Sequence, residues 1–116
     1  MPELAEVEFF RRQWRSGLRQ RIVAVQLHHR KRVFRGANTR LIVSELTGRK
    51  LLRSFARGKQ MLFEFSGQRW IGIHLGMSGK LRIEPAGFQP GKHDHLVFQQ
   101  ARQALVLCDP RLFGRV

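Results

Sequence analysis

The chain opens with Met1-Pro2-Glu3, a run that sets an amine beside a carboxyl group. Once the initiator methionine is removed, Pro2 carries a free secondary amine. The pKa of a terminal amine lies near ~8, against ~10.4 for a lysine side chain, so more of it is unprotonated at neutral pH. Such an amine can attack a sugar aldehyde carbon and form a covalent iminium, and Glu3 can carry protons. The alternative is that Pro2 and Glu3 simply begin a helix well.

Further along the chain lie other side chains suited to binding a nucleic acid. Lys59 follows a glycine between two strand-like runs, where it serves either as a phosphate anchor or as an ordinary turn lysine. Met77 lies in a glycine-flanked run, which argues against a role as a filler of the core. Phe113 by itself would be taken for a core aromatic, but Arg111 stands two residues before it.

The run His93-Asp94-His95 raises the question of a metal site. Alternate residues of a strand share one face, so the two imidazoles would point together and the carboxylate elsewhere. Protein metal sites usually need three or four ligands, so we expect a structural or phosphate-contacting role and no metal. Cys108 lies on an alternating run and is expected to be a small buried apolar residue.

The composition favours a polyanionic partner. The chain has 22 Lys+Arg against 8 Asp+Glu, a formal charge of +14, and the basic residues are mostly arginine and spread along the whole length. Arginine is well suited to bidentate phosphate contacts and to stacking on bases, although a merely basic, solvated surface is the alternative. A single cysteine excludes an intrachain disulfide. Because the N-terminus does not read as a signal peptide and no apolar run is long enough to span a membrane, we expect a cytoplasmic protein.

The periodicity of apolar residues predicts one domain with two helices and many short strands. A helix is expected over 3–19, a half-buried strand over 22–27 and a second short helix over 38–47. Strands are expected over 51–57, 61–65, 70–75, 80–84, 95–99 and 104–108, with a hairpin turn at Gly67-Gln68 and a loop over 85–91. The fold class is therefore α+β, mainly β: a two-layer antiparallel β-sandwich with an N-terminal helix and a second short helix.

Several motifs, taken in order and spacing, closely resemble the N-terminal domain of the formamidopyrimidine-DNA glycosylase / endonuclease VIII family, and its formamidopyrimidine branch in particular. They are residues 1–8, Gly58-Lys59, residues 74–79, residues 93–95 and residues 109–114. The resemblance implies that Pro2 is the nucleophile that attacks the deoxyribose C1′ and releases the damaged base. Glu3 would shuttle protons to the sugar and open its ring, and Lys59 would contact DNA phosphate and assist β-elimination.

The resemblance also assigns the remaining DNA contacts. His74, His93 and Arg111 would touch the DNA backbone or the strand opposite the lesion. Met77, Arg111 and Phe113 would fill the gap left by the flipped nucleotide, which agrees with the need to extrude a base before its glycosidic bond can be reached. Apolar wedges offset part of the unstacking free energy, and an arginine fork can hydrogen-bond the orphaned base.

The implied function is that of a bifunctional DNA glycosylase and AP lyase in base excision repair, acting on oxidised purines such as 8-oxoguanine and formamidopyrimidines. Its partner would be double-stranded DNA containing oxidised bases or abasic sites, bound by a nucleoid-associated monomer. Residues 1–116 would form the catalytic N-terminal domain. The family's helix–two-turn–helix and zinc-finger half is absent from this chain, so no cofactor is expected here.

Two residues depart from the family pattern, Ala5 where proline is usual and Leu112 where arginine is common. Alanine preserves a helix, whereas Leu112 removes one phosphate or interstrand contact. Two alternatives stay open: a DNA-binding module without catalysis, because half of the cleft is missing, and a basic RNA-binding β domain. The second gives no reason for Pro2-Glu3 at the start.

Overall fold

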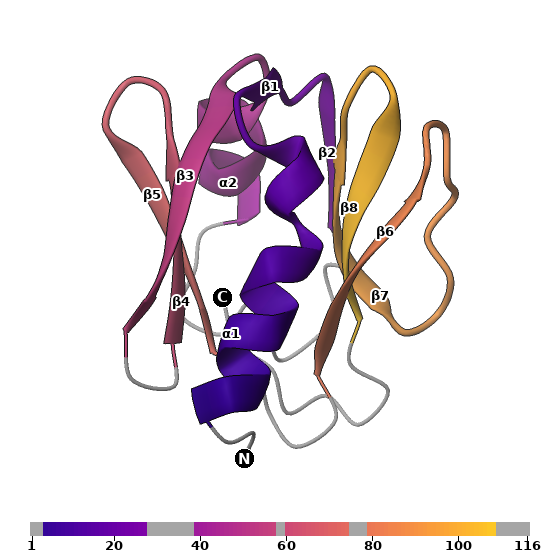
Figure 1. The fold of residues 1–116 in the computed structure, drawn as a ribbon. Helices are drawn as coiled ribbons and strands as arrows, with labels where there is room; N and C mark the ends of the chain where they lie inside the picture. The colour runs from indigo at the N-terminus through magenta and orange to yellow at the C-terminus, as the bar shows by residue number, and fades with distance from the viewer. Residues whose placement is uncertain (1–3, 28–38, 58–59, 75–78, 109–116) are drawn as a thin grey trace.

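The computed structural model describes residues 4–27, 39–57, 60–74 and 79–108, in which eight strands form two four-stranded antiparallel sheets (Figure 1). One sheet has the order β1-β3-β4-β5 and contains β1 (Gln20–Arg21), β3 (Lys50–Arg57), β4 (Gln60–Phe65) and β5 (Arg69–His74). The other has the order β2-β7-β8-β6 and contains β2 (Ala24–Leu27), β6 (Lys80–Pro85), β7 (Asp94–Gln99) and β8 (Gln103–Cys108). The predicted two-layer sandwich is confirmed.

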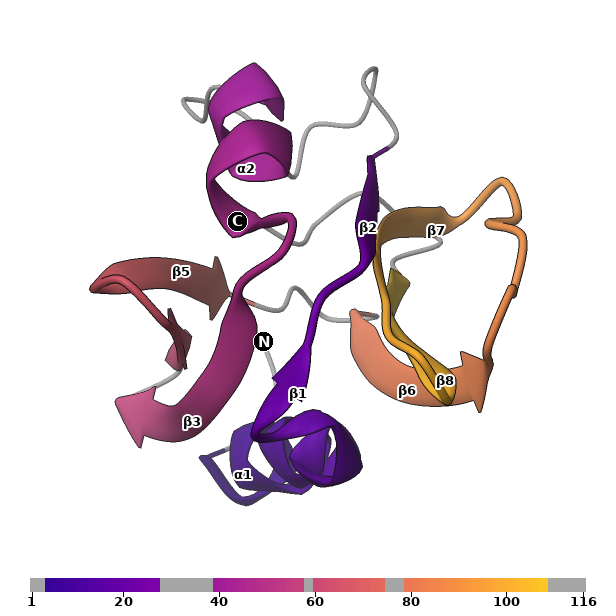
Figure 2. The same cartoon turned by 90° about the horizontal axis from the view of Figure 1, so that it is seen from above.

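Two helices close the open sides of the sandwich. Helix α1 (Leu4–Gln13) continues into a short 3-10 turn, η1 (Arg15–Gly17), and α2 spans Thr39–Leu46. Seen from above, the sheets stand apart with α1 on one side of the gap and α2 on the other (Figure 2). Helix α1 contacts β3 and β4 of one sheet and β6 of the other, so both layers hold it. Among the described residues, no helix is long and apolar enough to cross a membrane.

An aromatic cluster fills the space between the sheets. Trp14 is fully buried, and its ring centroid lies 4.9 Å from that of Phe63 and 5.7 Å from that of Phe98. Phe65 meets Phe98 at 5.5 Å from the other side. Edge-to-face and tilted pairs of this kind add to the free energy gained by burying the rings. The cluster thereby ties α1 to both sheets.

The first helix is shorter than the sequence predicted. A helix was expected over 3–19, but α1 ends at Gln13 and the next hydrogen bonds are of the tighter i to i+3 type. The N–H of Gly17 donates to the Trp14 carbonyl at 3.0 Å. At Gly17 an added Cβ would lie 2.8 Å from the Leu105 side chain, so close packing against β8 fixes the path of the chain there. Arg19 then turns the chain with a φ of +68°.

The strand expected over 22–27 is also different in the structure. The N–H of Ile22 donates to Arg49 at 2.8 Å, and the N–H of Val23 donates to Gln99, also at 2.8 Å. The chain therefore leaves one sheet at Ile22 and joins the other at Val23. As a result β1 and β2 are separate strands, and the Val23 side chain is 54% exposed instead of sharing the half-buried face.

Most of the remaining elements agree with the predictions. Helix α2 ends at Leu46 and is followed by Gly48 at φ +86°, and the turn at Gly67-Gln68 has φ values of +80° and +60°. The loop over 85–91 folds back so that Phe88 covers the outer face of β7 and β8. Strand β3 departs from strict alternation, because the register shifts after Leu51 and its outward aromatic, Phe55, is 43% exposed.

Candidate functional site

Most of the predicted site residues lie outside the described residues. These are Pro2, Glu3, Lys59, Met77, Arg111 and Phe113. His74 and His93 are described, and both are half-buried. The roles expected for all eight residues remain predictions, and the structure bears on them through the elements that precede and follow them.

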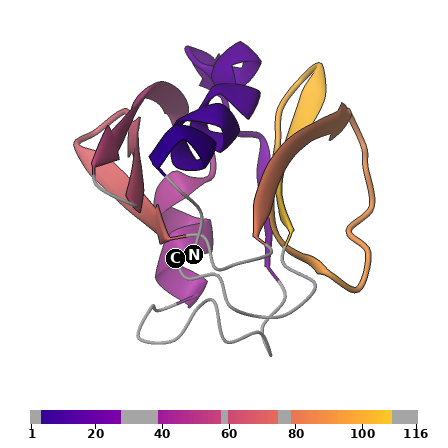
Figure 3. The same ribbon diagram turned by 60° about the horizontal axis from the view of Figure 1, so that its bottom comes forward.

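The described ends that border these motifs gather at one end of the sandwich. Arg57 at the end of β3 pairs with Gln60, and Gln60 pairs with His74 at the end of β5. In the other sheet Cys108, at the end of β8, pairs with Lys80 at the start of β6. The start of α1 lies at this same end, the lower one in Figure 1 and the nearer one in Figure 3. Antiparallel pairing thus brings together chain positions that are far apart in the sequence.

Helix α1 is fixed along its length by apolar and polar contacts. Val7, in the first turn of α1, and Trp14, directly after its last residue, are fully buried. The indole Nε1 of Trp14 donates to the backbone carbonyl of Arg82 on β6 at 3.2 Å. A helix held in this way is a rigid support for the residues that precede it.

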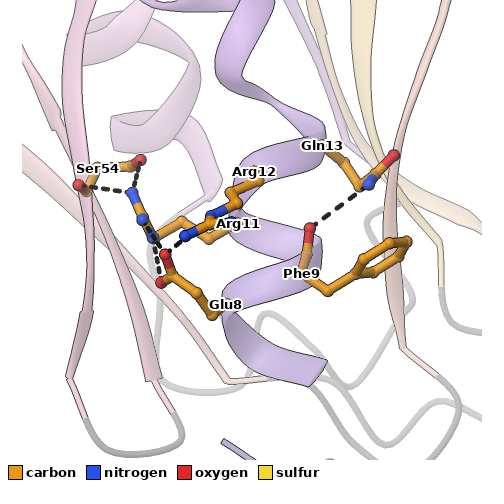
Figure 4. Close-up of polar contacts among 6 residues, drawn as sticks. All are labelled: Glu8, Phe9, Arg11, Arg12, Gln13 and Ser54. Carbon is orange, nitrogen blue, oxygen red and sulfur yellow. Dashed lines mark hydrogen bonds and ion pairs between the residues drawn. The ribbon is translucent and has the colours of Figure 1, made fainter. Parts of the chain in front are cut away.

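A polar clasp joins α1 to β3 (Figure 4). Arg11 donates from Nε to Glu8 Oε1 at 2.7 Å and from Nη2 to Glu8 Oε2. Its Nη1 donates to the Ser54 carbonyl at 3.1 Å and to Ser54 Oγ at 2.9 Å. The Nε of Arg12 adds a contact to Glu8 Oε2 at 3.2 Å.

These contacts change the titration of the residues in the clasp. The hydrogen bond from Arg11 lowers the pKa of Glu8 from its ordinary value near 4.5 to about 2. Burial acts in the opposite direction and raises this pKa, whereas the positive charge of Arg11 lowers it further. The same hydrogen bond raises the pKa of Arg11. Glu8 is therefore ionised at neutral pH and serves as a structural anion. It is a different carboxylate from Glu3, which is the expected proton carrier.

The run of residues 93–95 is built around Asp94. Burial raises the pKa of Asp94, but hydrogen bonds from Arg82 Nη1 at 2.9 Å and from the Gly91 N–H at 2.7 Å outweigh it and lower the pKa below its usual value. His93 Nδ1 is buried without a hydrogen-bond partner among the described residues. The described residues contain no group of three or more side chains placed to hold a metal ion. Asp94 is engaged by an arginine, and the structural or phosphate-contacting role expected for this run stays a prediction.

Cys108 differs from its expected role. The sequence predicted a buried small apolar residue, but Cys108 is half-buried and its side chain hydrogen-bonds to that of Asp94. The reason is its place at the end of β8, where it pairs with Asp94 in the strand register.

Sequence reasoning missed the polar contacts that hold α1 and β6. Glu8, Arg11 and Arg12 did not stand out in the sequence, although their spacing of three and four residues is the spacing of side chains that meet on a helix. The partner of Arg11 across the fold, Ser54, left no comparable signal. Nor did Arg82, which bonds both Asp94 and Glu84, at 2.9 Å and 2.6 Å.

Known proteins are similar to this chain in sequence and in fold. A model of the formamidopyrimidine-DNA glycosylase N-terminal domain matches residues 1–116. The formamidopyrimidine-DNA glycosylase of Herminiimonas arsenicoxydans is 41% identical over 117 residues, which cover 100% of this chain and 42% of that protein. The protein of the same name from Escherichia coli strain 536 is 40% identical over 119 residues, covering 98% of this chain and 42% of the relative.

Solved structures give the same result. The Lactococcus lactis FPG (MutM) in complex with DNA containing FAPY-dG superposes with a TM-score of 0.87 at 31% identity, covering 97% of this chain and 42% of that one. MutM in complex with DNA containing carbocyclic 8-oxo-G gives a TM-score of 0.88 at 31% identity, covering 98% and 43%. The chain thus spans less than half the length of these relatives. Because the family model matches every residue from 1 to 116, the chain belongs to the formamidopyrimidine-DNA glycosylase family.

Proposed function

We propose that this chain is the catalytic N-terminal domain of a DNA glycosylase that removes oxidised purines, such as 8-oxoguanine and formamidopyrimidines, and then cleaves the strand at the abasic site. The observation that carries the proposal is the gathering of the start of α1 and the ends of β3, β5 and β8 at one end of the sandwich. Each of these ends borders one of the motifs that resemble the family's site residues. The formal charge of +14 supports a nucleic-acid partner.

In the proposed reaction the free amine of Pro2 donates its electron pair to C1′ of the lesion nucleotide. The C1′–N9 bond breaks, and the base leaves with the bonding pair and takes up a proton. The nitrogen of Pro2 gives up its N–H proton, Glu3 protonates O4′ as the C1′–O4′ bond opens, and the C1′=N iminium forms. Loss of a C2′ proton then expels the 3′ phosphate, with Lys59 beside that phosphate. These steps need no redox partner or cofactor within this chain.

The remaining residues would hold the DNA open. Met77 and Phe113 would occupy the space of the extruded nucleotide, and Arg111 would hydrogen-bond the opposite base. His74, at the described end of β5, and His93, beside the start of β7, would contact the backbone. The partner in this proposal is duplex DNA with an oxidised base or an abasic site, bound by a monomer that works on the nucleoid.

An excision assay tests the proposal. The 116-residue chain, with Met1 removed, is incubated with a duplex containing 8-oxoguanine, alone and as a fusion to the C-terminal half of the Escherichia coli relative. We expect release of the base and strand cleavage by the fusion. In the matched control the nitrogen of Pro2 is acetylated, which converts the amine to an amide and leaves the other DNA contacts intact. Excision by the acetylated fusion at an undiminished rate would refute the mechanism.

A second candidate function concerns residues 1–116 by themselves, which correspond to 42% of the length of the relatives. The domain by itself would then bind duplex DNA without catalysing base release. The test compares the 116-residue chain with the fusion on an abasic duplex. If the 116-residue chain retains the duplex without nicking it and the fusion nicks it, the isolated domain has the binding role and the whole protein has the catalytic role.

A further inference from the structure

A basic pocket lies between α1 and β3, well away from the start of the helix. It has a volume of about 290 Å³ and is lined by Arg11, Arg12, Arg15, Leu18 and Ser54. Figure 4 shows Arg11 and Ser54 meeting across the gap, with Arg12 on the same side of the helix. None of these residues belongs to the site proposed above.

The three arginines differ in how many of their donors are used. Arg11 is committed to Glu8 and Ser54. Arg12 uses only Nε, toward Glu8, and its side chain is 66% exposed, so both terminal NH2 groups have no partner among the described residues. Arg15 is exposed and its guanidinium contacts no residue that the structure describes through a hydrogen bond or ion pair. Ser54 Oγ accepts from Arg11, which leaves its own proton free to donate.

The charges around the pocket do not balance. Three arginines and no carboxylate are among the described residues that line the pocket. Glu8 contacts Arg11 and Arg12, and it stays ionised because its pKa is about 2. Charge-assisted hydrogen bonds from arginine forks are shorter and stronger than neutral ones and match the geometry of phosphate oxygens. We propose that this pocket binds a phosphate group, held by Arg12, Arg15 and the Ser54 hydroxyl, and that the group comes from the DNA backbone beyond the lesion.

The position of the pocket along α1 sets which phosphate it would meet. Arg12 follows Leu4 by eight residues, so it lies about 12 Å along α1 at a rise of 1.5 Å per residue, and Arg15 lies in η1, just beyond the end of the helix. One strand of duplex DNA advances by about 3.4 Å per nucleotide. For a strand that ran parallel to α1 with the lesion level with Leu4, the phosphate would lie about four or more nucleotides from the lesion. Only this choice of source rests on the proposed function, because the pocket itself does not involve Pro2.

The first test measures phosphate binding without DNA. Side-chain Nε–Hε signals are recorded by NMR as sodium phosphate is added, against sodium chloride at equal ionic strength. We expect the Arg12 and Arg15 signals to shift with phosphate alone and the signal of Arg102 to stay in place. Arg102 is exposed in the turn between β7 and β8 and serves as the matched control. Equal shifts with the two salts would overturn the proposal.

The second test identifies the source of the phosphate. Binding to an undamaged duplex is measured over a range of salt concentrations for Arg12→Gln/Arg15→Gln and for Arg102→Gln. The salt slope should fall by about 0.9, the value for the loss of one phosphate contact, and it should stay unchanged in the control. Arg12→Lys/Arg15→Lys should keep the slope but weaken phosphate binding, because the bidentate fork is gone. Thermal unfolding of each variant confirms that the fold is intact.

The outcomes separate the two parts of the proposal. Phosphate-specific shifts with an unchanged salt slope would keep the phosphate site and refute its DNA source, leaving a free phosphate compound as the ligand. A flattened slope with the expected shifts supports both parts. Failure of base excision would not affect either readout, because neither uses a lesion nor the amine of Pro2.

Discussion

The clasp between α1 and β3 leads to a prediction whose size follows from its contacts. Arg11→Met keeps an apolar side chain of similar length but removes four hydrogen bonds, two to Glu8 and two to Ser54. A typical internal hydrogen bond contributes about 0.5–1.5 kcal/mol net. The side chains of Arg11 and Glu8 are 21% and 32% exposed, so solvent screening places each contact at the lower end. The free energy of unfolding should fall by about 2 kcal/mol.

Urea unfolding followed by circular dichroism measures this loss. The matched control is Arg12→Met, which removes one 3.2 Å contact from a side chain that is 66% exposed and should cost less than about 0.5 kcal/mol. A double-mutant cycle with Glu8→Gln should give a coupling energy of about 1 kcal/mol or more for Glu8 and Arg11. If Arg11→Met costs no more than the control, or the coupling is absent, the clasp does not fasten the helix.

Three other changes test the packing and the buried charges. Trp14→Ala should lower the free energy of unfolding by about 3–5 kcal/mol, because it leaves a cavity where the indole packs between the two sheets. Denaturant unfolding measures this loss, and a loss below about 1 kcal/mol would refute the prediction. Gly17→Ala should destabilise by about 1–3 kcal/mol, since its Cβ would meet Leu105 at 2.8 Å; an unchanged melting temperature would contradict that contact. The folded-state pKa of Glu8 lies at about 2, below its ordinary value near 4.5, so its stabilisation is complete above pH 4.5 and disappears as pH falls toward 2. The pKa of Asp94 is also lowered, so its stabilisation is likewise lost in acid. Glu8→Gln/Asp94→Asn should therefore show a flatter loss of stability in acid, and a slope equal to that of the unchanged chain would be the opposing result.

The fold could be predicted largely because local patterns and tertiary packing agree. The alternation in β4 and β5 corresponds to Met61 and Ile73 facing the core, and both are fully buried. The positions of Gly48 and Gly67 marked a helix end and a hairpin, and both adopt positive φ. Local sequence carries such signals because the backbone there needs a conformation that other residues rarely adopt.

The errors came where tertiary contacts decide the structure. The apolar stripe of the first helix continues to Leu18, yet Gly17 packs so closely on β8 that the helix narrows to a 3-10 turn and ends. Similarly, alternation alone could not show that the chain changes sheets between Ile22 and Val23. Both features depend on partners about eighty residues away or on the opposite sheet, which a window of sequence does not contain.

In the candidate site, too, local motifs could be predicted from the sequence and tertiary contacts could not. The motifs supply the candidate residues, whose roles remain predictions, and the antiparallel register explains how the elements that border them reach one end of the sandwich. The clasp was missed because a serine on β3 has no motif of its own. Its partner Arg11 is one of many arginines in a chain with 22 Lys+Arg, so charge alone did not distinguish it.

The central claim is that Pro2 supplies the attacking amine, and borohydride trapping on abasic DNA tests it most directly. Borohydride is added while the fusion protein reacts with an abasic duplex, so that any iminium adduct is reduced to a stable amine. The protein is then digested, and the cross-linked peptide is identified by mass spectrometry. The account predicts a deoxyribose adduct on the nitrogen of Pro2, with no adduct when that nitrogen is acetylated. An adduct carried by a lysine side chain, or one that persists on the acetylated protein, would contradict it.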